Sequence, residues 1–276
     1  MNDSVLFSDL ALAHRLEAAE ARAGAASADP LSRLHPELGA AVEDVAGGLA
    51  VFAGVGSPLS EGRGCGLAGP VTPEEVARLE EFFVSRGDAL RIEICAMADP
   101  SLAMMLSQRG FVIAEFVSVL ARRLTAEVGS SGRTSADKSG TGVRPIATTE
   151  KAAWAAVVAA GFAEHFAATR ELQQLLECAA LASGALAFLA YQDGVPAGGG
   201  ALFIHEGVAL LGGAATLPAF RKRGIQTALV KARLNHAARL GCDLASSSTQ
   251  PGSASQRNLE RQGFRVVYNS FKMARV

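Results

Sequence analysis

Cysteine is scarce and scattered in this chain of 276 residues. No Cys-x-x-Cys pair and no Cys/His cluster occurs, and zinc sites need closely spaced ligands of these kinds. Small secreted proteins carry a denser cysteine framework than this. We therefore expect no metal, and interpret as reduced packing residues the four thiols Cys65, Cys95, Cys178 and Cys242.

Long apolar runs are also missing near the beginning of the chain. Asp9, His14, Arg15 and Glu17 interrupt the apolar positions there. This pattern is typical of an amphipathic helix and not of a signal peptide or a membrane span. We therefore expect a cytoplasmic protein with no membrane partner.

Neither sign of charge dominates, because the formal net charge is −1, but the two halves of the chain differ. Residues 1–124 hold 17 acidic and 10 basic side chains, and the remaining residues hold 10 acidic and 16 basic ones. No basic run interleaved with aromatic residues is present, so nucleic acid is not an expected partner. The basic half predicts an anionic ligand there, although chance placement of solvated surface charge would give the same totals.

A segment nearly free of large apolar residues separates the two halves. Residues 125–142 read TAEVGSSGRTSADKSGTG, a Gly/Ser/Thr-rich composition that suits a flexible connector. The chain is long enough for two domains of ordinary size. We therefore predict domains at 1–124 and 143–276, joined by a linker at 125–142.

The two halves end with a similar order of predicted elements. A shift of 153 residues places Leu106 on Leu259 and Gly110-Phe111 on Gly263-Phe264. A tandem duplication with one drifted copy explains this order, and chance similarity between two α/β segments is the alternative. In the first half, we predict helices at 73–86 and from 99, and strands at 90–95 and 112–120.

The second half predicts a mixed α/β (α+β) domain with a largely antiparallel start. Asp193-Gly194 is a strong hairpin turn signal. The predicted strands are 143–147, 186–191, 195–204, 208–217, 244–248 and 266–273. The predicted helices are 150–160, 170–182, 224–239 and 251–261.

The most informative segment runs from Ala214 to Val230. An apolar strand leads into Pro218, a basic loop with one glycine follows, and an amphipathic helix comes next. A strand–loop–helix of this kind directs unpaired backbone N–H groups and the helix dipole at one spot, which suits a pyrophosphate. A plain helix start with basic surface residues is the alternative.

This loop resembles that of a known family. Residues 221–226, RKRGIQ, are similar to the R/Q-x-x-G-x-G/A acyl-CoA loop of the GCN5-related N-acetyltransferases, and Asn258-x-x-x-x-Gly263-Phe264 resembles their closing helix and strand. The resemblance covers the second half, and residues 72–123 look like a degenerate copy. It implies two tandem domains, each with a mixed, mostly antiparallel twisted sheet flanked by helices. The first domain lacks the basic loop and is expected to bind no CoA.

The resemblance also implies a site and a reaction. The co-substrate would be acetyl-CoA or another acyl-CoA, and the acceptor a small-molecule or peptide amine, in a monomer or a homodimer. Backbone groups of Ala215, Thr216 and Leu217 would hold the pantetheine arm and thioester, with the Leu217 N–H as the oxyanion contact. Further cofactor contacts would come from Arg221, Lys222, Arg223, Gly224, Ile225, Gln226, Thr227, Ser248 and Asn258.

Two departures from the family pattern affect these roles. Gln226 stands where the family usually has Gly or Ala, so its side chain must point away from the phosphates. The tyrosine that often protonates the leaving thiolate aligns with Leu259, so that acid is missing or comes from elsewhere. A non-catalytic acyl-CoA-binding sensor or scaffold protein is therefore the alternative function.

The amine acceptor must lose a proton before it attacks the thioester, which requires a base near the site. No Cys/His or Ser/His pairing is visible, so direct transfer is expected. Glu164 and His165, between the first two helices, are the favoured bases, with His205 and Glu206 as further candidates. Residues 198–200, three glycines, indicate either close substrate approach to a strand or a β-bulge.

A second glycine-rich stretch, residues 64–69, matches the dinucleotide fingerprint G-x-G-x-x-G. That motif needs a strand directly before it and a helix directly after it. The flanking residues 57–62 and 70–73 contain prolines and are expected to form loops, so we interpret this stretch as a loop.

Overall fold

The computed structural model describes residues 6–125, 140–163 and 169–275. Two compact units are present. Unit 1 comprises Met1–Leu120, Ser248–Gln256 and Val266–Val276, and unit 2 comprises Ala121–Ser247 and Arg257–Arg265. Most of the predicted linker, residues 126–139, lies outside the described residues, while residues 141 and 142 belong to a strand.

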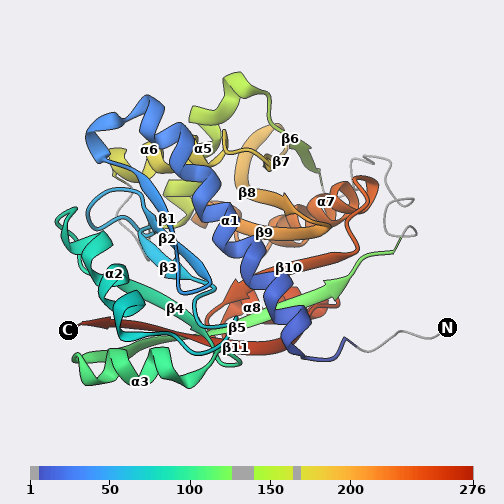
Figure 1. Ribbon diagram of the computed structural model, residues 1–276. Helices are drawn as coiled ribbons and strands as arrows, with labels where there is room; N and C mark the ends of the chain where they lie inside the picture. The colour runs from blue at the N-terminus through green and yellow to red at the C-terminus, as the bar shows by residue number, and fades with distance from the viewer. Residues whose placement is uncertain (1–5, 126–139, 164–168, 276) are drawn as a thin grey trace. The chain divides into compact units, whose positions relative to one another are not determined.

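Unit 1 is a sheet with helices packed against it (Figure 1). The strand order is β1-β2-β3-β4-β11-β5, in which β3 and β4 are parallel and β4 and β11 antiparallel. The core places Phe83 of α2 and Leu106 of α3 against Ile92 of β4. The helices are α1 (Leu10–Leu34), α2 (Pro73–Val84) and α3 (Pro100–Gln108), and the strands are β1 (Ala41–Val45), β2 (Gly48–Phe52), β3 (Glu61–Arg63), β4 (Arg91–Cys95), β5 (Phe111–Arg123) and β11 (Arg265–Arg275).

Unit 2 is built around the strand order β10-β9-β8-β7-β6, in which β9 and β10 are parallel and the other pairs antiparallel. Trp154 is fully buried at the centre of its core. The strands are β6 (Thr141–Pro145), β7 (Ala185–Gln192), β8 (Val195–His205), β9 (Val208–Thr216) and β10 (Leu244–Thr249), and the helices are α5 (Lys151–Gly161), α6 (Arg170–Ala179), α7 (Ile225–Arg239) and α8 (Ala254–Arg261).

The structure has the predicted mixed α/β class, with helices flanking the sheets. It also contains every element predicted in the two halves, with bounds that differ by a few residues. The last strand of the chain, β11, pairs with β4 of unit 1. The compact units therefore do not follow the chain as the predicted domains 1–124 and 143–276 do. The alternation of apolar residues predicts a strand but does not identify its partner, because either edge of a sheet offers the same hydrogen bonds.

No helix of the described residues is long and apolar enough to cross a membrane.

Candidate functional site

The segment from β9 to α7 in unit 2 leaves a helix start without a cap. After β9, a short 3-10 turn (Pro218–Phe220) leads to Lys222 and Gly224, whose φ angles are 62° and 82°. Gly224 is the N-cap of α7, makes no side-chain cap bond, and no acid stands in the first turn. The first helical hydrogen bond runs from the Ala228 N–H to the Gly224 carbonyl. The N–H groups of residues 224–227 therefore lack helical acceptors and are available to an anion.

Basic side chains surround this helix start. Lys222 and Arg223 are exposed, and the Arg223 guanidinium lies 5.7 Å from the centre of the Phe220 ring. Arg221 is half-buried and donates to the Gly161 carbonyl at 3.5 Å, which ties the loop to the end of α5. The positive end of the helix dipole and these cations act in the same direction, so the loop favours a ligand with several negative charges.

The strand β9 extends beyond its parallel partner. Residues 208–210 pair with residues 244–246 of β10, and the Ser247 hydroxyl donates to the Leu211 carbonyl at 2.8 Å. Beyond that point, residues 212–216 have no paired residue of β10 within the described part of unit 2. This stretch offers a strand edge to which an extended chain of amides can hydrogen-bond.

The predicted oxyanion contact is wrong for the atom named. The Leu217 N–H donates to the Ala197 carbonyl of β8 at 3.0 Å, so it is already occupied. Successive N–H groups of a strand point to opposite edges. The Thr216 N–H therefore points away from β8, toward the edge that β10 leaves open, and it is the candidate for this role.

The three glycines of residues 198–200 lie opposite a β-bulge of β9, where Gly213 and Ala214 together face Gly200, which agrees with the second of the two predicted interpretations. The register between β8 and β9 shifts between Gly199 and Ala201, and Gly213 on β9 has a φ angle of 54°. A Cβ on Gly199 would lie 2.9 Å from Nε1 of Trp154. These glycines let the strands and helices pack without side chains between them, which explains their run without invoking a substrate.

A buried arginine supports this bulge. Arg233 of α7 is 2% exposed, and its guanidinium donates to the carbonyls of Ala201 (2.9 Å) and Gly212 (3.3 Å). Burial lowers its pKa to about 10, which still leaves it charged at neutral pH. Sequence reasoning missed this residue. Its position four residues after Leu229, on the apolar stripe of α7, is the signal that could have identified it.

The end of α5 lies against the same stretch of β9. A Cβ on Gly161 would meet the Cβ of Ala215 at 2.5 Å and the Thr216 nitrogen at 3.2 Å. The segment that follows α5 therefore starts beside the proposed oxyanion contact. The two favoured bases, Glu164 and His165, belong to that segment but lie outside the described residues.

The polar side chains predicted to bind the cofactor are distributed over both units. Gln226 donates from Nε2 to the Thr216 hydroxyl at 2.9 Å, so its side chain lies against β9. The Thr227 hydroxyl donates to Oδ1 of Asn258 at 3.3 Å, which brings α8 to the first turn of α7. Ser248 belongs to unit 1, where its hydroxyl donates to Oε1 of Glu20 at 2.8 Å.

The remaining acid–base candidates are not at this site. His205 and Glu206 lie at the β8–β9 turn, about eight residues from Ala197 along β8, which corresponds to roughly 26 Å. They are therefore wrong as candidate bases. Leu259, which stands where the family tyrosine is expected, is buried and offers no proton.

The dinucleotide interpretation of residues 64–69 stays rejected, with one correction. Glu61 and Gly62, expected to lie in a loop, belong to the short strand β3. The stretch itself forms turns, and α2 begins at Pro73, after the intervening residues 70–72. No helix start therefore faces these glycines in the way the fingerprint requires.

Comparison with known proteins agrees with this geometry. The chain is similar to a GCN5-related N-acetyltransferase from Kribbella flavida, with a TM-score of 0.63 and 19% identity over 91% of this chain and 95% of that one. It is also similar to a tandem GNAT protein from the clavulanic acid biosynthesis pathway, with a TM-score of 0.52 and 16% identity over 70% and 66% of the two chains. No curated protein matches the chain.

These structural likenesses concern the fold, which is that of the GCN5-related N-acetyltransferases. The model of the acetyltransferase (GNAT) family matches residues 153–264, which include α5, β9, the basic loop and α7. This segment of the chain is therefore similar to the GNAT acetyltransferase family.

Proposed function

We propose that unit 2 binds acetyl-CoA, or a related acyl-CoA, and transfers the acyl group to the amine of a small molecule or peptide. The match of residues 153–264 to the GNAT family supports acyl transfer from an acyl-CoA in general. The observation that carries the finer proposal is the uncapped start of α7 beside the open edge of β9. The first suits a pyrophosphate, and the second suits the amide-containing arm that leads to the thioester.

The reaction proceeds by direct attack of the amine on the thioester carbonyl. An amine with a pKa near 10.4 is protonated at pH 7, and removal of that proton costs about 4–5 kcal/mol. The attack builds negative charge on the carbonyl oxygen, and the Thr216 N–H is directed to the edge where that charge would develop. A contact of this kind contributes about 3 kcal/mol in comparable sites.

The thiols of unit 2 do not favour a covalent acyl-enzyme. Cys178 and Cys242 are both buried, and burial raises the pKa of each thiol, which disfavours the nucleophilic thiolate. Glu164 and His165 remain the proposed bases, because the segment after α5 starts beside Ala215 and Thr216.

Titration calorimetry with acetyl-CoA tests the binding half of this proposal. We expect micromolar affinity for the intact chain, and at least tenfold weaker affinity for the Arg221→Ala/Arg223→Ala variant. Lys231→Ala, which removes an exposed charge farther along α7, is the matched control and should bind as the intact chain does. Absence of binding by the intact chain would contradict the proposal.

Release of free CoA thiol on addition of amines tests the catalytic half. The buried Leu259 in place of an acid is the observation that favours the alternative, a protein that binds acyl-CoA without turnover. Binding with no thiol release across polyamines, amino acids and peptide N-termini would support that alternative. Release with any of these amines would support the transferase.

A further inference from the structure

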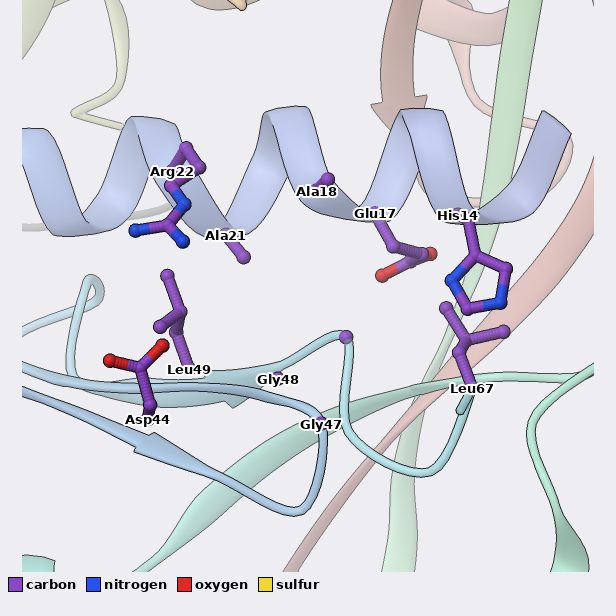
Figure 2. Close-up of a pocket in the computed structure, with 11 residues that line it drawn as sticks. His14, Glu17, Ala18, Ala21, Arg22, Asp44, Gly47, Gly48, Leu49 and Leu67 are labelled. Carbon is purple, nitrogen blue, oxygen red and sulfur yellow. The ribbon is translucent and has the colours of Figure 1, made fainter. Parts of the chain in front are cut away.

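A cavity of about 120 Å³ lies in unit 1 between α1 and the β1–β2 turn, on a floor made of glycine backbone (Figure 2). Gly47 lies in this turn, Gly48 begins β2, and Gly64 follows β3. Figure 2 shows Glu17 and His14 toward one end of the cavity and Arg22 opposite Asp44 toward the other. An apolar cavity of comparable size holds a benzene molecule in another protein, so a small organic ligand has room here.

Glu17 lines this cavity and carries a carboxylate oxygen without a hydrogen-bond partner. Its residue is 2% exposed, its Oε1 accepts a hydrogen bond from the Tyr268 hydroxyl at 3.0 Å, and its buried Oε2 has no hydrogen-bond partner. Buried carboxylate oxygens are normally paired, because an unpaired one loses its hydration without compensation. The oxygen therefore calls for a donor that the described residues do not supply.

The charges around Glu17 favour a positively charged donor, because carboxylates outnumber cations there. Arg63 of β3 forms ion pairs with Glu20 (3.6 Å), Glu61 (2.6 Å) and Glu93 (2.9 Å). Lys272 of β11 lies 3.5 Å from Glu61, 3.8 Å from Glu93 and 3.9 Å from Glu115. With Glu17 included, five carboxylates face two cations. Glu93 is also buried; its Oε2 takes part in these ion pairs, and its Oε1 has no hydrogen-bond partner.

The donor is not expected to be a metal ion. In the described residues, no group of three or more His, Cys, Asp or Glu side chains could hold one. Arg63 stands among the carboxylates and separates them. A primary ammonium differs from a metal ion because it carries one charge and three N–H donors. A few acceptors, such as a carboxylate oxygen and backbone carbonyls, are enough to satisfy these donors.

We propose that this cavity of unit 1 binds a small protonated primary amine, whose ammonium group donates to Oε2 of Glu17. The glycine floor accommodates the carbon chain, and Asp44, which lies opposite Arg22, offsets its charge. The site belongs to unit 1, whereas the proposed acyl-CoA loop belongs to unit 2, and the proposal does not depend on the proposed reaction.

Titration of Glu17 gives this site a pH dependence. Burial raises the pKa of Glu17 to about 7, with further increases from Glu93 and Glu20 and an opposing effect of Arg63. Above pH 7 the carboxyl is ionised while an alkylamine is still protonated. Affinity should therefore fall about tenfold from pH 8 to pH 6. His14 also lines the cavity, so His14→Gln, which should keep this dependence, is the control.

An NMR titration of the intact chain with n-propylammonium chloride, at constant chloride and without CoA, tests the proposal. At pH 8, saturable shifts of the amide signals of Gly47, Gly48 and Gly64 are expected, with a Kd between about 0.05 and 5 mM for a ligand of this size. Tetramethylammonium carries the same charge but no N–H donor, and should not produce them.

Two substitutions separate contact with Glu17 from general attraction. Glu17→Gln keeps the shape of the side chain and should weaken binding at least tenfold. Glu20→Gln removes a charge from the same network without lining the cavity, and should change Kd less than threefold. No saturation with the intact chain, equal binding by Glu17→Gln, or equal shifts with tetramethylammonium would each overturn the proposal. Should Glu17→Gln fail to fold, a Kd that does not change between pH 8 and pH 6 in the intact chain and His14→Gln would overturn it.

Discussion

The helices α2 and α7 each follow a strand and a loop, but they differ in whether side chains of the chain cap their first N–H groups. At the start of α2, the Thr72 hydroxyl accepts from the Glu75 N–H at 3.3 Å, and the Glu75 carboxylate accepts from the Thr72 N–H at 2.8 Å. At the start of α7, Gly224 provides no side-chain cap. The first turn of α2 holds Glu74 and Glu75, whereas that of α7 holds no acid.

This difference shows what makes a helix start available to an anion. Both helices carry the same backbone dipole, so the dipole alone does not distinguish them. In α2, the chain supplies its own carboxylates and satisfies the N–H groups that a phosphate would need. In α7, glycine at the N-cap and basic residues before it leave those groups for a ligand. The side chains of the cap and the first turn therefore decide whether the first N–H groups of such a helix are available to an anion.

The largest expected effect comes from giving α7 the acids of α2. Gln226 and Thr227 occupy the second and third helical positions, as Glu74 and Glu75 do in α2. In Gln226→Glu/Thr227→Glu, two negative charges would face the proposed pyrophosphate. At about 6 Å and an effective dielectric constant near 20, each costs roughly 2–3 kcal/mol. We expect affinity for acetyl-CoA, measured by calorimetry, to fall on the order of a thousandfold.

Lys231→Glu is the control for this variant, because it also changes the net charge by two units but lies farther along α7 and is exposed. It should weaken binding less than tenfold. Equal losses in the two variants would mean that the overall charge of the unit, and not the helix start, determines the affinity.

The fold was largely predictable from the sequence because its local signals agree with one another. The period of the apolar residues, Asp193-Gly194 at the β7–β8 turn and Pro73 at the start of α2 all predict the elements that form. The basic loop before α7 was predictable for the same reason, since its glycine and its run of basic residues are local signals, and Lys222 and Gly224 adopt the positive φ angles of a tight turn.

The features that sequence reasoning missed depend on contacts distant in sequence. The pairing of β11 with β4 needs the register between two edges, which no local pattern records. The Leu217 N–H is occupied because the bulge sets which residues of β8 and β9 face each other. The buried carboxylate of Glu17 is unsatisfied only in the context of β3 and β11, although its sequence pattern indicates an ordinary amphipathic helix.

The second expected effect tests the acidic character of unit 1. The pKa of Glu17 is raised from 4.5 to about 7, so the folded state holds a proton that the unfolded state releases between these values. Stability must therefore fall as the pH rises through this window, by an amount on the order of 3 kcal/mol. We expect Glu17→Gln to be more stable than the intact chain at pH 8 and similar to it at pH 4. Urea unfolding at both pH values, followed by circular dichroism, would measure this.

Glu20→Gln provides the comparison for this measurement, because Glu20 is partly exposed and pairs with Arg63. It should be no more stable than the intact chain at either pH. A stability difference between Glu17→Gln and the intact chain that is equal at pH 4 and pH 8 would contradict the raised pKa of Glu17.

The third effect concerns the bulge that unit 2 has beside its site. In Gly199→Ala, the new Cβ would lie 2.7 Å from Cγ2 of Val158 and 2.9 Å from Nε1 of Trp154. Overpacking of this kind costs about 2 kcal/mol. Trp154 is the single tryptophan of the chain, so its fluorescence during urea unfolding reports on unit 2. Gly212→Ala, where a Cβ meets nothing within 4 Å, should cost less than half as much.

The smallest effect tests the cap of α2 itself. Thr72→Ala removes the hydroxyl that accepts from the Glu75 N–H, and loss of such a cap costs about 1 kcal/mol of stability. Thr169→Ala, which removes the matching cap of α6 in unit 2, should cost a similar amount. Neither variant should gain or lose affinity for acetyl-CoA, because Glu74 and Glu75 still repel phosphate at the start of α2. If Thr72→Ala created a second CoA site, the hydroxyl cap alone, and not the acids of the first turn, would be what keeps α2 from binding an anion.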